Sequence, residues 1–123
     1  MNILNIVFYL TTSKQEPVRQ WLLEQSKKDR KDISQEIKAF EYCWSLGMCI
    51  SKKIEQDLWV IIIKVSPDLV AKIFYTVKIP KISSSDLELK KTVILLHGFI
   101  EKSQIISPSD LMIANKRKNN VLS

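Results

Sequence analysis

The 123-residue sequence contains only two glycines, two cysteines and one histidine, and its apolar runs are short. Cys43 and Cys49 lie six positions apart with no second pair and no neighbouring histidine, which matches neither a zinc site nor a redox CxxC motif. The apolar N-terminus lacks the basic leader and cleavage site of a signal peptide, and residues 58–63 are too few to span a bilayer. We therefore expect a cytoplasmic protein with reduced cysteines, no metal, no small-molecule cofactor and no membrane partner.

Hydrophobic residues make up 46% of the chain and charged residues 26%, which is typical of a folded globular protein. The length predicts a single domain over residues 1–118, followed by a tail at 119–123 that frays. Nineteen lysines and arginines against thirteen acidic residues give a net charge of +6. This balance favours a polyanionic partner such as RNA, DNA or an acidic protein, although charge alone also fits a basic protein that binds no nucleic acid.

The spacing of apolar residues changes from strand-like to helix-like and back along the chain. Residues 3–10 predict a strand, and residues 16–24 predict an amphipathic helix with Pro17 in its first turn. A charge cluster at 27–32 predicts an elbow before a second helix that ends at Gly47.

The second half of the chain returns to strand-like spacing. The pattern predicts a strand-like segment from Met48, strands at 58–65, 70–79 and around 93–96, a turn at 66–68, a loop at 80–90 and a helix after Ser107. The predicted fold class is therefore α+β, with an N-terminal strand, a two-helix hairpin, an antiparallel β-meander and a short C-terminal helix.

Alternation along residues 70–79 divides the side chains of this strand between two faces. Ala71, Ile73 and Tyr75 share one face, which predicts core packing. Lys72 and Phe74 fall on the other face, which we expect to be open. A lone cation among apolar neighbours is a candidate for a functional role, and Phe74 would accompany it on the open face.

The stretch 91–104 contains His97, the only histidine of the chain, and histidine is the residue type that most often serves as a general acid or base. His97 could act as a general acid or base. By alternation, however, it shares a face with Val93 and Leu95, which favours structural support near the core. Lys102 comes directly after this predicted strand. Its charge fits contact with an RNA phosphate or exposure to solvent equally well.

These elements resemble the phage-derived HigB-type toxins of the RelE superfamily, the toxin halves of type II toxin–antitoxin pairs. The most specific match is the Leu-Leu-His-Gly-Phe block at 95–99 with the following lysine. The matching segments run in order through about nine tenths of the chain: 17–22, 29–30, 33–37, 46–48, 53–59, 72–75, 95–99, 102–104, Pro108, Ala114 and Arg117.

The resemblance implies a RelE-like fold and a ribosome-dependent mRNA endoribonuclease whose partners are the ribosome, mRNA and a helix-turn-helix antitoxin. In that reaction a ribose 2′-OH attacks the adjacent phosphate, which requires a base, cations that stabilise the added phosphate charge and an acid for the leaving oxygen. The residues that we expect to serve are Lys72 and Lys102 as the catalytic cations, Lys27, Lys28, Arg30, Lys52, Lys53 and Phe74 in RNA binding, and His97 in structural support.

The sequence departs from the family pattern at positions where charge is expected. Val60 and Ile62 stand where the family carries a glutamate and an arginine, and Lys72 replaces a second arginine. Many members of the family carry two lysines after the Gly-Phe pair, and here Glu101 stands in place of the first. These replacements would weaken contact with a phosphate.

These departures support an alternative, a non-catalytic member that retains the toxin fold and binds an antitoxin or nucleic acid. A DNA-binding regulator is less favoured, because no predicted helix exposes a set of base-reading side chains.

Overall fold

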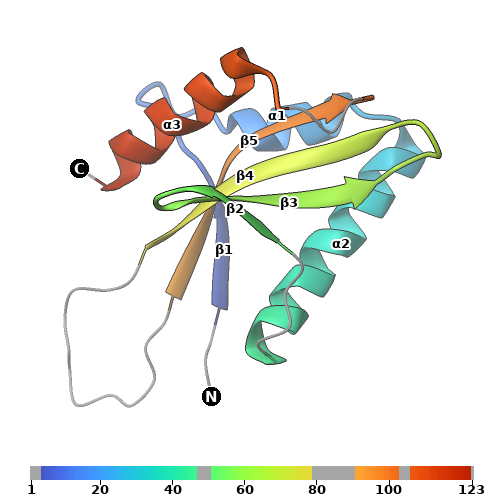
Figure 1. Ribbon diagram of the computed structural model, residues 1–123, viewed down its shortest axis with the longest axis horizontal. Coiled ribbons are helices and arrows are strands. Elements are labelled where there is room, and N and C mark those ends of the chain that lie inside the picture. The colour runs from blue at the N-terminus through green and yellow to red at the C-terminus, as the bar shows by residue number, and fades with distance from the viewer. Residues whose placement is uncertain (1–3, 47–50, 79–90, 103–105, 123) are drawn as a thin grey trace.

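A computed structural model describes residues 4–46, 51–78, 91–102 and 106–122 (Figure 1). The predicted α+β class and its order of elements are confirmed. The described elements are β1 (Leu4–Phe8), α1 (Pro17–Glu24), α2 (Lys27–Leu46), β2 (Lys52–Glu55), β3 (Leu58–Lys64), β4 (Val70–Lys78), β5 (Lys91–Glu101) and α3 (Pro108–Leu122). The predicted cap at Gly47, the start of the strand-like segment at 48–50 and the loop at 80–90 lie outside the described residues.

Within the described residues the strands form one sheet in the order β1-β5-β4-β3-β2. β1 pairs in parallel with β5, and the other neighbouring strands are antiparallel. The predicted turn at 66–68 is confirmed, because Val65 donates its backbone N–H to the carbonyl of Leu69 at 3.1 Å and the chain then enters β4. β4 therefore lies between β3 and β5, at the centre of the sheet.

The two faces of β4 are both buried. Residues 71–76 are all buried. Ala71, Ile73 and Tyr75 pack against α1 and α2, and Phe74 packs in the cluster beneath α3, which lies on the opposite face of the sheet (Figure 1). The expectation of an open face for Lys72 and Phe74 is therefore wrong, since these side chains are 3% and 0% exposed. Alternation separates the faces of a strand correctly, but it does not reveal that a distant helix returns to cover the second face.

A β-bulge interrupts the pairing of β4 with β5. Phe74 is opposite His97, but the next residue, Tyr75, is opposite Leu95, so Leu96 is an extra residue in β5. The bulge reverses the alternation beyond it and turns His97 towards α3. The prediction that His97 shares a face with Val93 and Leu95 is wrong for this reason, because those two residues pack against α1 and α2.

The charge cluster at 27–32 is the start of α2 and not an elbow. The side chain of Ser26 accepts a hydrogen bond from the backbone N–H of Asp29 at 3.1 Å, which satisfies a donor in the first turn. The acidic Asp29 also complements the positive end of the helix dipole. The connection between α1 and α2 is therefore shorter than the charge pattern predicts.

The C-terminal segment is helical as far as Leu122, so the expected fraying from residue 119 is not observed in the part of the tail that the structure describes. The side-chain amide of Asn120 donates to the Tyr9 hydroxyl at 3.2 Å. Val121 packs against the same apolar cluster as Tyr9. These contacts hold the last turns of α3 against the sheet.

Gly98 allows α1 to approach the sheet closely. A Cβ atom at this position would lie 2.5 Å from Cε3 of Trp21, closer than two carbon atoms can approach without a shift. Trp21 in turn packs against the cluster between α1, α2 and the sheet. The absence of a side chain at Gly98 therefore fixes the separation of α1 and β5.

We expect Gly98→Ala to lower the free energy of unfolding by about 1–3 kcal/mol, because the added methyl group overpacks the contact with Trp21. Urea denaturation followed by circular dichroism measures the change. The control is Lys78→Ala, at an exposed position of β4, which we expect to change stability by less than about 0.5 kcal/mol. Equal effects of the two substitutions would contradict this account of Gly98.

Candidate functional site

The α3 face of the sheet is covered at one end and uncovered at the other. Leu58, Val60 and Phe74 are buried in the cluster beneath α3. Further along β3 on the same face, Ile62 is 47% exposed and Lys64 is exposed. The end of the sheet next to the β3–β4 turn is therefore accessible on this face, among the residues that the structure describes.

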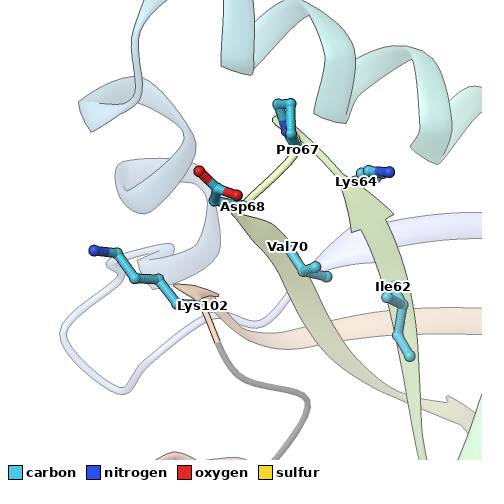
Figure 2. Close-up of a pocket in the computed structure, with 6 residues that line it drawn as sticks. All are labelled: Ile62, Lys64, Pro67, Asp68, Val70 and Lys102. Atoms are coloured by element: carbon cyan, nitrogen blue, oxygen red, sulfur yellow. The ribbon is translucent and has the colours of Figure 1, made fainter.

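A hollow of about 670 Å³ lies at this accessible end. Figure 2 shows the side chains of Lys64 and Lys102 pointing in opposite directions, with Val70 between them in this view and Ile62 below Lys64. We call this site the basic hollow, and its described lining residues are Ile62, Lys64, Pro67, Asp68, Val70 and Lys102. Its two exposed ammonium groups and partly apolar floor suit a ligand that combines negative charge with a flat or apolar group.

Lys72 lies on the same face as Ile62 but forms a buried ion pair. Its Nζ is 3.0 Å from Oε2 of Glu101, and the two side chains are 4% and 12% exposed. The pairing register places Lys72 between Ile62 on β3 and Phe99 on β5. Because desolvating either charge alone is costly, each member of the pair keeps the other in place.

His97 is joined to α3 and not to the basic hollow. Its Nε2 lies 2.7 Å from Oδ1 of Asp110 in the first turn of α3. Its ring also stacks on Phe99, with 5.5 Å between the ring centroids. Since Phe99 is opposite Lys72 in the register, its ring separates His97 from the lysine along the strand face. The contacts of His97 therefore connect β5 with α3.

Arg117 binds the carbonyl of the extra residue in the bulge. Its Nη1 donates to the Leu96 oxygen at 2.8 Å, and its guanidinium lies 5.6 Å from the centroid of the Tyr9 ring. Burial lowers the pKa of the Arg117 guanidinium, while the interaction with Tyr9 opposes that change. A bulge disrupts the ladder locally, and Arg117 supplies a donor to it from α3.

The structure places the lysines and the arginine that we expected to bind RNA in two separate groups. Lys28, at the start of α2, donates to the carbonyl of Val65 at 3.3 Å and so lies near the β3–β4 turn. Lys27 and Arg30 belong to the same first turns of α2. Lys52 and Lys53 instead lie on β2, opposite Val60 and Trp59, at the other end of β3.

Sequence reasoning missed the role of Glu101 as the partner of Lys72. Alternation would have assigned it to the other face, because the bulge at Leu96 is not visible in the spacing. The available signal was the opposite charge of two isolated residues on adjacent antiparallel strands. Lys64 and Asp68 were also missed as lining residues of the hollow, since both flank a turn and resemble ordinary exposed positions.

Two layers of helices around a mixed five-stranded sheet, with a C-terminal helix on one face, define a RelE-like α+β fold for the described residues. The chain matches the family described as phage derived protein Gp49-like (DUF891) over residues 20–119. It therefore belongs to the Gp49-like family of phage-derived proteins, which is part of the RelE-like toxin–antitoxin group. Comparisons with curated proteins and with solved structures gave no significant match.

None of the helices in the described residues is both long and apolar enough to cross a membrane.

The ion pair of Lys72 with Glu101 predicts a distinctive pattern of stability changes. Lys72→Met leaves a buried carboxylate without this partner, so we expect the free energy of unfolding to fall by about 3 kcal/mol. The double substitution Lys72→Met with Glu101→Leu removes both charges and should restore stability to within about 1 kcal/mol of the wild type. Urea denaturation measures all three proteins.

The matched control is the exposed ion pair of Arg19 with Glu16, whose side chains are 62% and 32% exposed. Arg19→Met should cost less than about 1 kcal/mol, because solvent screens an exposed pair. A loss for Lys72→Met no larger than that for Arg19→Met would contradict the importance of the buried pair.

Proposed function

We propose that this member of the family is a HigB-type toxin of a type II toxin–antitoxin pair and cleaves mRNA on the ribosome. The observation that carries the proposal is the placement of lysines from three neighbouring strands at one end of the sheet. Lys64 ends β3, Lys72 lies in β4 and Lys102 follows β5. Two of these lysines line the basic hollow, where an RNA backbone would have access to them.

In the proposed reaction the 2′ oxygen of a ribose forms a bond to the adjacent phosphorus, and the bond from phosphorus to the 5′ oxygen of the next nucleotide breaks. The 2′ oxygen loses its proton to a base, and the departing 5′ oxygen gains one. The phosphate gains negative charge on the way, which Lys102 at the hollow and Lys72 beneath it are proposed to stabilise. Phe74 is left out of this proposal, because its side chain is 0% exposed beneath α3.

The proposed partners follow from the family and from the charge. Membership in a toxin–antitoxin group suggests an antitoxin, which we propose to be a helix-turn-helix protein. The basic first turns of α2, with Lys27, Lys28 and Arg30, and the lysines of β2 are proposed to contact ribosomal RNA phosphates separately, because they lie at different ends of β3. His97 supports the fold in this proposal through its contact with Asp110.

We expect induction of the wild-type protein to arrest growth and to produce new RNA 5′ ends within translated messages. Lys102→Ala should lower the cleavage rate on the order of tenfold, because it removes a cation that faces the phosphate. Sequencing of RNA 5′ ends, with and without an inhibitor of translation initiation, measures both cleavage and its dependence on the ribosome. The matched control is Lys38→Ala, at an exposed position of α2 away from the hollow.

Three results would contradict the proposal. They are the absence of both growth arrest and new 5′ ends, cleavage that persists unchanged when translation is blocked, and equal activity of the Lys102→Ala and Lys38→Ala proteins at matched expression.

The second candidate function is a non-catalytic module that binds an antitoxin or nucleic acid through the same face. It is favoured by the presence of Ile62 in the hollow, opposite Lys72, at a position where the related toxins carry an arginine. Val60, where they carry a glutamate, is 1% exposed beneath α3, so an acid there would be buried in an apolar cluster. Ile62 is therefore the position at which lost activity can be restored by a single substitution.

If this second candidate is correct, we expect Ile62→Arg to convert an inactive protein into a toxic one, because the guanidinium would enter the hollow between Lys64 and Lys72. Growth after induction and sequencing of RNA 5′ ends measure the gain. Ile62→Gln is the control, since it adds polarity at the same position without charge. Cleavage by the wild-type protein, or no gain in Ile62→Arg over Ile62→Gln, would count against this candidate.

A further inference from the structure

The carboxylate of Glu101 is the anion that contacts Lys72 in this structure. The carboxylate Oε2 is 3.0 Å from the ammonium Nζ, and both side chains are largely buried. A buried ammonium requires a neighbouring anion, and in the free protein Glu101 supplies it. An RNA phosphate at Lys72 would offer the same charge and the same type of oxygen acceptor. The carboxylate and the phosphate would therefore compete for one lysine.

We infer that Glu101 controls the binding of RNA by acting as an internal competitor of the phosphate. The inference rests on the function proposed above, because it assumes that RNA binds at the basic hollow. Lys64 and Lys102 are exposed at the hollow and make the first contacts. Lys72 joins them only when the carboxylate of Glu101 releases it.

The energetic consequence follows from the linkage between the ion pair and the ligand. A ligand that binds only the released form of Lys72 has its affinity reduced by the fraction of molecules in that form. Burial strengthens the attraction between Lys72 and Glu101, so that fraction is small in the wild type. Removing the charge of Glu101 takes away the carboxylate that lies 3.0 Å from the Lys72 ammonium, and an incoming phosphate then replaces the lost charge.

Asp68 provides a matched control for the loss of one negative charge. It lines the same hollow, but its side chain is exposed, in contrast to Glu101. Asp68→Asn and Glu101→Gln each raise the net charge by one with little change in shape. A difference between these two variants therefore reports the release of Lys72 and not the general increase in positive charge.

The experiment measures binding of a short fluorescent single-stranded RNA by fluorescence anisotropy at several salt concentrations. The RNA carries 2′-O-methyl groups, so it cannot be cleaved by attack of a 2′-OH. We expect Glu101→Gln to raise the affinity on the order of tenfold, and Asp68→Asn to raise it by about twofold at most, since an exposed charge is screened. The slope of log affinity against log salt should become steeper by about 0.7 in Glu101→Gln alone, because one more phosphate is neutralised.

The double variant Lys72→Gln with Glu101→Gln tests whether the gain depends on Lys72. It should return both the affinity and the salt slope to about the wild-type values. A gain that persists in the double variant would overturn the inference, and so would equal gains in Glu101→Gln and Asp68→Asn. In either case binding by the wild type would leave the proposed function standing. Failure of the wild type and every variant to bind would contradict the proposed function, and the inference with it.

A measurement on the wild type covers the case in which Glu101→Gln does not fold. In protein labelled with ¹³C glutamate, saturating RNA should move the carboxyl resonance of Glu101 towards the position of an unpaired glutamate. The carboxyl resonance of Glu16, which belongs to the exposed pair on α1, serves as the internal control. RNA binding without a change at Glu101 would overturn the inference.

Discussion

Burial of both faces of β4 is the constraint on which the rest of the structure depends. A strand whose residues 71–76 are all buried requires an apolar layer on each side of the sheet. The helices α1 and α2 provide one layer, and α3 provides the other. The surface that carries the candidate site is the part of the sheet that these layers leave uncovered, since α3 covers only one end of its face. The accessible end of the sheet is thus a consequence of how the core is closed.

The position of Lys72 shows how stability and function can oppose each other in this fold. A lysine in a central strand needs compensation of its charge, and Glu101 provides it at 3.0 Å. The same compensation reduces the positive charge that the site can offer to a ligand. The exposed Lys64 and Lys102 carry no such constraint, so the electrostatic field at the hollow depends mainly on residues at the ends of strands and not on the residue at the centre.

The sequence was sufficient for the order and type of the elements, because spacing of apolar residues reports how each segment meets the core. It was insufficient where long-range packing decides the outcome. Lys72 and Phe74 were expected on an open face, but both are buried, Phe74 in the cluster beneath α3 and Lys72 in an ion pair with Glu101. The candidate site was predicted in part, since Lys72 and Lys102 lie at the same end of the sheet, but the partner of Lys72 was not identified. Glu101 could not be assigned to the correct face without knowledge of the bulge.

The bulge at Leu96 also affects how related sequences should be compared. Every side chain of β5 after the bulge faces the side opposite to the one that uninterrupted alternation would give, including His97, Phe99 and Glu101. A relative with the same residues but without the bulge would pair them one position out of register and present a different set of side chains to α3. Alignment of this strand is therefore meaningful for function only where the bulge in its pairing with β4 is preserved.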